Sequence, residues 1–219
     1  MHVHRLPAWV AETNAYIVSN DEGVAVLIDA PPDPGLIGQH LARLDLAVVG
    51  IVLTHGHVDH TGGAGALAAA SGAVTYVHAD DDFLTLHPTR QLHAIFGTAP
   101  PGSYEVPETI EYLEHKQKLN LAGVGLEVRH TPGHTPGHVC LYWEDQGMLF
   151  TGDQLFAGSV GRTDLPGGSW EQLLVSMRDQ VMTLDDEVDV LPGHGPETTV
   201  GRERATNPFR GEWQSLNTG

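Results

Sequence analysis

The sequence contains a single cysteine and few basic residues. Cys140 has no partner for an internal disulfide, and its place in an apolar stretch predicts a small core residue. The 11 Lys and Arg residues are outnumbered by 28 Asp and Glu residues, which gives a formal net charge of −17. Such a surface repels phosphate backbones and anionic lipids, so we expect neither a nucleic-acid nor a membrane partner.

Targeting and membrane-spanning patterns are also missing. The first residues, MHVHRLPAWVAET, show no basic segment followed by an apolar one, which argues against a signal peptide. No apolar run is long enough to cross a bilayer. We therefore expect a cytoplasmic protein, and the sequence leaves both a monomer and a homodimer open.

What is present is a chain of 219 residues, 41% of them hydrophobic, which predicts one domain over residues 1–219. Strands are predicted at 14–18, 24–28, 48–53, 74–77, 125–129, 139–143, 148–150 and 187–191. Helices are predicted from Pro34, over 64–70, from Trp170 to Val181 after a capping box at Ser169, and over 199–206. Residues 83–107 show no clear period and are expected to be irregular.

The order of these elements predicts the architecture. Strand-rich stretches followed by helices occur twice, which favours an α/β (α+β) fold of two packed sheets with helices outside, an αββα four-layer sandwich. The run at 48–53 is continuously apolar and is expected to be a strand buried on both faces.

Polar clusters follow the predicted strands, and they contain many of the 14 histidines. THGHVDH (54–60) follows the strand at 48–53, and HTPGHTPGH (130–138) follows the strand at 125–129. Gly152-Asp153 and Gly193-His194-Gly195 follow two further strands. Rigid strands hold such loops in place, and glycines let the backbone approach a bound group, so we interpret the clusters as one site.

The residue types in these clusters indicate metal binding. Imidazole and carboxylate are the usual ligands of zinc and similar divalent metals. Residues i and i+2 of an extended segment point the same way, so His55 and His57 can share one ion. Asp59 and His60 lie further along the chain and can reach a second ion.

The distant loops can complete both coordination spheres. His134 and His194 can add one ligand each, and the two oxygens of Asp153 can bridge the ions. This count leaves a position for water, which is typical of a catalytic site. We therefore predict two divalent ions, with zinc as the first choice and iron or manganese as alternatives.

The competing interpretation is that these histidines are ordinary surface residues. That interpretation is adopted for the isolated ones, which are His2, His4, His40, His78, His87, His93 and His115. Clusters that follow strands and are flanked by glycine favour a metal site instead. A binding protein without catalysis is the corresponding functional alternative.

These motifs resemble the metallo-β-lactamase superfamily. The resemblance runs from Asn14-Ala15-Tyr16 through THGHVDH, HTPGHTPGH and FTGDQLF to LPGHGPETT, nearly the whole chain. It implies an αββα sandwich with the metals at one edge between the sheets. It also implies that Asp29 and His138 support the site without being ligands.

The resemblance further implies how the ligands divide between the ions. The first metal would be held by His55, His57 and His134, the second by Asp59, His60 and His194, with Asp153 bridging. The pair His60 and Asp153 resembles the glyoxalase II-like (hydroxyacylglutathione hydrolase-like) branch in its small bacterial form, because true β-lactamases usually lack the former and many have a cysteine in place of the latter.

Two departures from glyoxalase II concern its thiol. The loop at 161–165 lacks the tyrosine of that enzyme, and the chain has no long basic C-terminal region, so glutathione recognition is not implied. Arg162 is the only cation of this loop and is a weak candidate for binding a substrate carboxylate. A salt bridge between Arg162 and Asp164 is the alternative.

The predicted activity is hydrolysis of a small-molecule thioester by metal-bound hydroxide. Asp59 can accept a hydrogen bond from the hydroxide and orient it, and a thiolate leaves without a strong general acid. The alternatives are a persulfide dioxygenase, with one iron held by the equivalents of His55, His134 and Asp153, and a lactonase or other ester hydrolase. A metal-dependent ribonuclease is disfavoured by the net charge.

Overall fold

The first half of the chain forms a six-stranded mixed sheet. The computed structural model describes residues 1–216, without the side chains of residues 94–96. In spatial order the strands are β1 (His2–Ala8), β2 (Thr13–Ser19), β3 (Val24–Ile28), β4 (Ala47–Val52), β5 (Val74–Val77) and β6 (Ile110–Tyr112). Strands β1 to β3 pair antiparallel, and β3 to β6 pair parallel.

The second half forms another six-stranded sheet. Its strands, in spatial order, are β14 (Thr198–Thr199), β13 (Asp189–Pro192), β10 (Met148–Gly152), β9 (Val139–Trp143), β8 (Val124–His130) and β7 (Lys118–Leu121). Only the pair β10 and β13 is parallel within this sheet. A small hairpin, β11 (Leu155–Phe156) with β12 (Ser159–Val160), follows β10.

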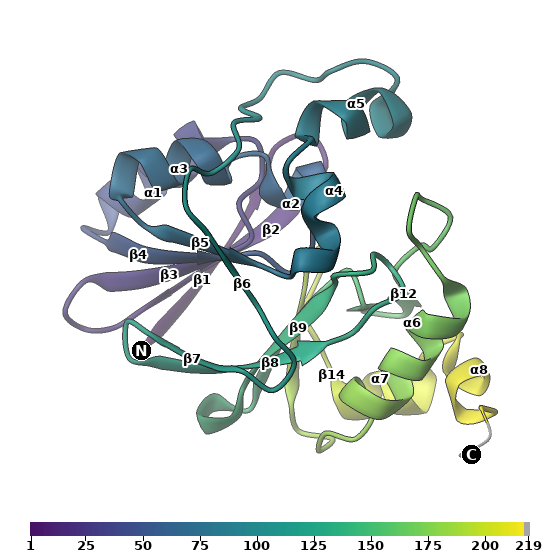
Figure 1. Cartoon of the computed structure of the whole chain (residues 1–219). Helices are drawn as coiled ribbons and strands as arrows, with labels where there is room; N and C mark the ends of the chain where they lie inside the picture. The colour runs from purple at the N-terminus through teal and green to yellow at the C-terminus, as the bar shows by residue number, and fades with distance from the viewer. Residues whose placement is uncertain (217–219) are drawn as a thin grey trace.

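Helices cover the outer faces of the two sheets (Figure 1). In the first half α1 (Pro34–Arg43) and α3 (Ala64–Ser71) do so, whereas α2 (Val58–Thr61), α4 (Asp82–Thr85) and α5 (Pro88–Phe96) pack against one another beside the sheet. In the second half they are α6 (Trp170–Ser176), which a π-helical turn at 177–181 extends, α7 (Val200–Thr206) and α8 (Arg210–Gln214). The Ser169 hydroxyl accepts a hydrogen bond from the Gln172 N–H and caps α6, as predicted.

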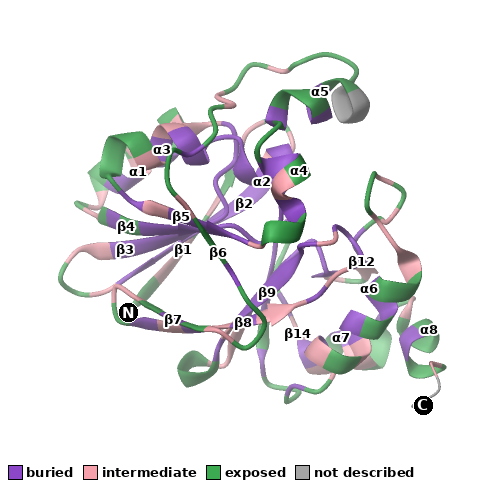
Figure 2. Cartoon of the chain, in the orientation of Figure 1, coloured by how far each residue is buried: buried purple, intermediate pink, exposed green. Residues whose placement is uncertain are grey.

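Apolar side chains gather in separate layers, which confirms the predicted αββα sandwich. One cluster lies between the sheets and joins Tyr16 and Val26 to Leu141 and Phe150. A second cluster packs the first sheet against α1 and α3, and a third packs the second sheet against α6 to α8. Figure 2 shows these buried strands enclosed by helices with exposed outer faces.

The expectation of an irregular segment at 83–107 is wrong for its first part, which contains most of α4 and all of α5. Pro88 occupies the first turn of α5, where its missing N–H costs nothing. A buried amide, that of Gln91, anchors this helix: it donates to the carbonyls of Gly56 and Leu84 and accepts from the Val58 N–H. Because a polar side chain holds this helix, its sequence lacks the apolar periodicity that predicts a helix.

The strand at β4 is not buried on both faces throughout, because Val49 is 43% exposed. Residue Ala25 of β3 pairs with Val48, whereas the next residue, Val26, pairs with Gly50. Val49 is therefore the extra residue of a β-bulge, which turns its side chain out of the regular alternation. Strand β1 is a further element that the sequence did not indicate.

In the part of the chain that the structure describes, no helix combines the length and the apolar character needed to cross a bilayer.

The position of Cys140 generates a first prediction. Its side chain is fully buried in the cluster under α6, and burial raises the pKa of its thiol to about 12. We expect a chromogenic disulfide reagent to leave the native protein unlabelled at about pH 8, since the thiolate is the reactive form. In denaturant, the same reagent should label one thiol per chain. Rapid labelling of the native protein would contradict this placement.

Candidate metal centre

The structure brings all the predicted ligands together at one edge of the sandwich. His55 and His57 lie in the loop after β4, and Asp59 and His60 lie in the short helix α2 that follows. The remaining ligands come from the second half: His134 from the β8–β9 connection, Asp153 from the residue after β10, and His194 from the loop after β13. All of these positions follow strand ends, as the sequence predicted.

Three nitrogen atoms form the first donor group. The distance from His57 Nδ1 to His55 Nε2 is 3.1 Å, and to His134 Nε2 it is 2.8 Å. All three side chains are buried. The donor atoms lie within 4.8 Å of one another, a spacing at which they can hold one ion.

The second donor group contains a carboxylate and two imidazoles. His194 Nε2 lies 3.2 Å from Asp59 Oδ2 and 3.3 Å from His60 Nε2. Asp153 lies between the groups: its Oδ1 is 3.3 Å from His60 Nε2, and its Oδ2 is 3.5 Å from His134 Nε2. One carboxylate thus faces both groups, as expected of a bridging ligand.

Hydrogen bonds behind the rings determine which ring nitrogens carry a proton. His60 donates from Nδ1 to Asp29 Oδ2 (2.7 Å), and His134 donates from Nδ1 to the Arg162 carbonyl (2.7 Å). His55 Nδ1 lies 3.1 Å from the Thr54 hydroxyl, whose proton goes to Asp29. The Nε2 atoms of His55 and His134 therefore present unprotonated lone pairs to the centre. At His60, burial would by itself lower the pKa, but the carboxylates of Asp153, Asp59 and Asp29 outweigh it and raise the pKa, so a cation bound there would displace a proton.

Converging lone pairs need a cation. Asp153 Oδ1 is buried and, among the described residues, accepts no hydrogen bond. Imidazole nitrogens and carboxylate oxygens that converge at 2.8 to 3.3 Å need protons or cations between them, and divalent cations would satisfy several of these donors at once. The donor set, two imidazole-rich groups joined by a carboxylate, therefore fits two divalent cations of the zinc or iron type.

The electrostatic environment keeps His55, His57 and Asp153 in their metal-binding forms. Burial lowers the pKa of His55 well below its usual value, and burial with the neighbouring His134 lowers the pKa of His57 to about 3. Burial would by itself raise the pKa of Asp153, but the charges of His60 and His194 outweigh it and lower that pKa. At neutral pH, His55 and His57 are neutral and Asp153 is ionised.

Asp29 and His138 occupy the supporting positions that the resemblance implied. Asp29 accepts from the Thr54 N–H at 2.8 Å as well as from His60, so it joins the metal loop to the end of β3. His138, just before β9, accepts from the Asp153 N–H at 3.1 Å, and its Nδ1 lies 2.8 Å from the Thr131 hydroxyl. The ring thereby places the backbone of the bridging carboxylate.

A supporting residue that the sequence did not reveal is Asp81. Its buried carboxylate accepts from the N–H of Gly56 (2.7 Å), the hydroxyl of Thr135 (2.7 Å) and the N–H of Gly137 (2.6 Å). It therefore joins the loop of His55 and His57 to the loop of His134. In the sequence Asp81 sits within Asp80-Asp81-Asp82, which resembles an exposed acidic turn.

The same contact explains two glycines of the motifs. A Cβ atom on Gly56 would lie 2.9 Å from the Asp81 Cβ, and one on Gly137 would lie 2.7 Å from its Cγ. Real Cβ atoms do not approach so closely, so the carboxylate reaches both loops only because neither residue has a side chain.

Side chains of β2, in the first sheet, hold the loop that carries His194. The Asn14 amide donates to the carbonyls of Pro192 (2.9 Å) and Gly195 (3.0 Å), on either side of the histidine. The Tyr16 hydroxyl donates to Pro192 at 2.8 Å. The stretch Asn14-Ala15-Tyr16 therefore positions a ligand far away in the sequence.

Arg162 lies at the centre but is already paired. It lines a cavity of about 430 Å³ together with Ala11, His57, Asp59, His134, Asp153, Phe156, Val160, Leu165 and His194. Its guanidinium donates twice to the Asp164 carboxylate, at 2.7 Å each. The salt bridge that was the alternative to substrate binding is thus present, and it uses the Nε and Nη2 edge of the guanidinium.

A further group of donors lies apart from this centre. His78, expected to be an ordinary surface residue, stacks on His130 with ring centroids 4.1 Å apart and planes 7° apart, and Asp80 lies beside them. Lone pairs lie in the ring planes, so parallel rings cannot direct theirs to one ion. The His78 Nδ1 also accepts from the Asp80 N–H. This group therefore does not form a metal site as it stands.

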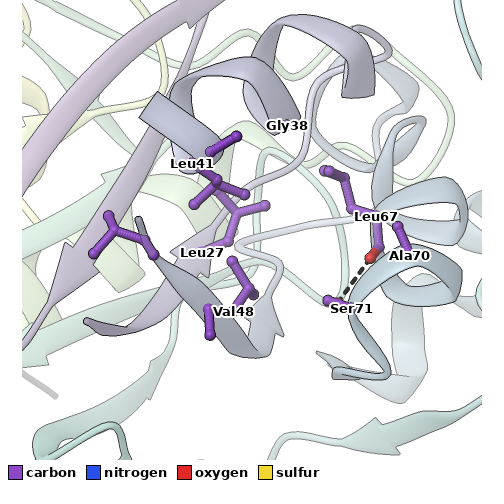
Figure 3. Close-up of a pocket in the computed structure, with 10 residues that line it drawn as sticks. Leu27, Gly38, Leu41, Val48, Leu67, Ala70 and Ser71 are labelled. Atoms are coloured by element: carbon purple, nitrogen blue, oxygen red, sulfur yellow. Dashed lines mark hydrogen bonds between the residues drawn. The ribbon is translucent and has the colours of Figure 1, made fainter. Parts of the chain in front are cut away.

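Another cavity, of about 380 Å³, lies between α1 and α3 (Figure 3). Apolar and small residues such as Leu27, Leu41 and Leu67 line it, and the Ser71 hydroxyl there donates to the Leu67 carbonyl. Among the described residues, no titratable side chain lines this cavity.

The family model of the metallo-beta-lactamase superfamily matches residues 8–194, and the chain belongs to that superfamily. Among similar proteins, hydroxyacylglutathione hydrolase GloC of Haemophilus influenzae is 32% identical over 209 residues, which cover 95% of this chain and 98% of GloC. The probable metallo-hydrolase YqgX of Bacillus subtilis is 34% identical over 213 residues, covering 95% and 97% of the two chains.

Two solved structures are similar over nearly their whole length. The B3 metallo-beta-lactamase BLEG-1 superposes with a TM-score of 0.88 at 33% identity, over 95% of this chain and 99% of that one. The protein TTHA1623, solved in a di-iron-bound form, superposes with a TM-score of 0.85 at 38% identity, over 94% and 100% of the two chains.

The role of Asp81 generates a second prediction. In Asp81→Asn, one carboxylate oxygen is replaced by an amide NH2, which cannot accept a hydrogen bond. At least one of the three buried donors that point at Asp81 therefore loses its acceptor. We expect the free energy of unfolding, measured in urea, to fall by about 2–3 kcal/mol. Asp80→Asn is the matched control, because Asp80 is exposed and should change stability by less than about 0.5 kcal/mol. An unchanged unfolding midpoint for Asp81→Asn would contradict the assignment.

Proposed function

We propose that the chain is a di-metal hydrolase that cleaves small-molecule thioesters, with His55, His57 and His134 holding one ion, Asp59, His60 and His194 the other, and Asp153 bridging. The observation that carries the choice of substrate is the composition of the central cavity. Among the described residues that line it, every histidine and carboxylate belongs to the donor groups. Arg162 is the remaining ionisable group, and it cannot act as a proton donor near neutral pH.

This composition favours a leaving group that needs no proton. A thiolate departs unprotonated from a tetrahedral intermediate, whereas an amine or alkoxide needs a general acid. When bound, divalent ions lower the pKa of water from about 15.7 to about 7 and polarise a carbonyl oxygen, so attack also needs no separate base. A thioester therefore requires nothing that the cavity lacks.

The residues around the donors orient the nucleophile. The Thr13 hydroxyl donates to Asp59 Oδ2 at 3.1 Å, which holds the carboxylate toward His194. The Asp59 carboxylate can accept a hydrogen bond from the O–H of the attacking nucleophile and direct its lone pair at the carbonyl carbon. Phe156 and Val160 form apolar wall beside the donors and keep bulk water from that side.

The comparisons support this proposal in two respects. GloC carries the name of a thioester hydrolase, and the di-iron form of TTHA1623 supports the binding of two ions. Zinc remains our first choice of metal, with iron or manganese as alternatives. Because Asp164 occupies Arg162, glutathione is not singled out as the thiol.

A second candidate is β-lactam hydrolysis, which the likeness to the B3 metallo-beta-lactamase BLEG-1 supports. Opening a β-lactam ring expels an amide nitrogen that must acquire a proton. The central cavity offers no acid apart from the donor groups, so we rank this reaction second.

Metal content provides the third prediction. Protein purified without chelators should contain about two zinc, iron or manganese ions per chain by elemental analysis. His194→Ala should reduce this to about one, because the second group loses one of its three protein ligands. His93→Ala, an exposed histidine of α5, is the matched control and should leave the content unchanged.

The same measurement separates the rival activities. One iron per chain in the wild type, with oxygen uptake in the presence of a persulfide, would replace the hydrolase by the persulfide dioxygenase. A content far below one ion after reloading would overturn the metal assignment itself.

Substrate selection provides the fourth prediction. With the metal-loaded wild type, we expect kcat/KM for an acetyl thioester to exceed that for the matched oxygen ester and for a chromogenic β-lactam by at least about a hundredfold, since only the thiolate leaves without an acid. Faster cleavage of the β-lactam would make the second candidate the activity of this chain. Faster cleavage of a lactone would favour the lactonase.

A further inference from the structure

A second cavity opens beside the metal centre. It has a volume of about 380 Å³ and lies between α4, α5 and the loop that leads into α6, which face each other in Figure 1. His57 and Leu165 line both this side cavity and the central one. The other residues around the side cavity are Phe83, Leu84, His87, Arg90, Gln91 and Pro166. The two cavities therefore adjoin at these residues.

The walls of the side cavity are mainly apolar. Phe83 and Leu84 come from α4, and Leu165 and Pro166 come from the opposite loop. Phe83 is 46% exposed, so part of its ring is available to a bound molecule. A Cβ on Gly167 would lie 3.1 Å from Phe83 Cζ, so the loop backbone stays close to the ring and completes the wall.

One cation of this cavity is free. Arg90 is exposed on α5, and within the described residues its guanidinium makes no ion pair or hydrogen bond. The chain has only 11 basic residues, and Arg162 beside the centre is paired with Asp164. Gln91 uses its amide entirely in holding α5 to its neighbours. Arg90 is therefore the permanently charged group that can bind an anion at this wall, where His87 can add a hydrogen bond.

We propose that the side cavity binds the acyl arm of the substrate and that Arg90 binds a carboxylate at the end of that arm. The substrate class would be thioesters of dicarboxylic acids with a short methylene chain. This inference rests on the proposed thioesterase activity and adds its acyl specificity.

The geometry of a thioester indicates which of its two arms, acyl or thiol, enters the side cavity. Its carbonyl carbon reacts at the metal centre, so the acyl and thiol arms leave in different directions. Thiol carriers are polar, whereas the side cavity presents Phe83, Leu84 and Leu165. The acyl methylenes therefore fit the side cavity, and the thiol arm fits the central cavity on the side of Phe156 and Arg162.

The test uses thioesters of one uncharged thiol, N-acetylcysteamine, so that the acyl arm carries the only charge. The metal-loaded full chain is assayed with glutaryl and adipoyl thioesters and with their uncharged counterparts, pentanoyl and hexanoyl. We expect kcat/KM for at least one dicarboxylic member to exceed that of its counterpart by about tenfold. In Arg90→Gln this ratio should fall to about twofold or less.

Two further variants make the result specific. Arg202→Gln, at an exposed arginine of α7 outside both cavities, changes the net charge equally and should leave the ratio at its wild-type value. Phe83→Ala should lower the ratio of hexanoyl to acetyl thioester kcat/KM by about fivefold, because the methylenes lose their apolar wall. If the ratio of dicarboxylic to uncharged thioester is equal in the wild type and Arg90→Gln, the role of Arg90 is overturned. If the ratio of hexanoyl to acetyl thioester is unchanged in Phe83→Ala, the assignment of the acyl arm to the side cavity is overturned.

The outcome also separates this inference from the proposed function. Cleavage of the acetyl thioester without any dicarboxylic preference would leave the thioesterase standing and overturn the inference. If the wild type cleaves no thioester, the proposed function fails. Calorimetry with adipate and hexanoate on the metal-loaded protein then tests whether the side cavity binds a dicarboxylic acid. Tighter binding of adipate that Arg90→Gln abolishes would support it, whereas equal binding would overturn it.

Discussion

The structure is organised around one electrostatic constraint, the convergence of unprotonated nitrogen and carboxylate donors at a buried edge between two sheets. His57 Nδ1 and His134 Nε2 approach to 2.8 Å without bulk water between them. Such an arrangement needs protons or cations between the donors, and the surroundings hold the donors in place. The rest of the edge can be understood as the set of contacts that position these donors.

Those contacts join segments that are far apart in the sequence. Asp29 connects β3 to His60, and Asp81 connects the two histidine loops. His138 positions the backbone of Asp153, and Asn14 holds the loop of His194. Each donor is therefore fixed by a neighbour from a different strand end, and the distances within the centre depend on both halves of the sandwich.

Burial and charge together determine which chemistry the centre favours. Every acid or base of the central cavity is committed to the donor groups, and Arg162 is committed to Asp164. In the proposed reaction, bound cations would supply the activation and the substrate a good leaving group. The free cation, Arg90, lies in the adjoining cavity, where it bears on specificity more than on bond cleavage.

The sequence by itself determined the donor types, their grouping at strand ends and the αββα layers. These properties are local, because ligand chemistry depends on residue type, and the i, i+2 spacing of His55 and His57 acts within one loop. Only the tertiary structure decided that Asp81 is buried while its neighbour Asp80 is exposed, that Arg162 is paired, and that α5 forms around Gln91. The burial of Asp81 and the anchoring of α5 depend on contacts between distant segments, which neither apolar periodicity nor motif spacing encodes. The pairing of Arg162 with Asp164 is local, but the sequence left it open against a contact with substrate.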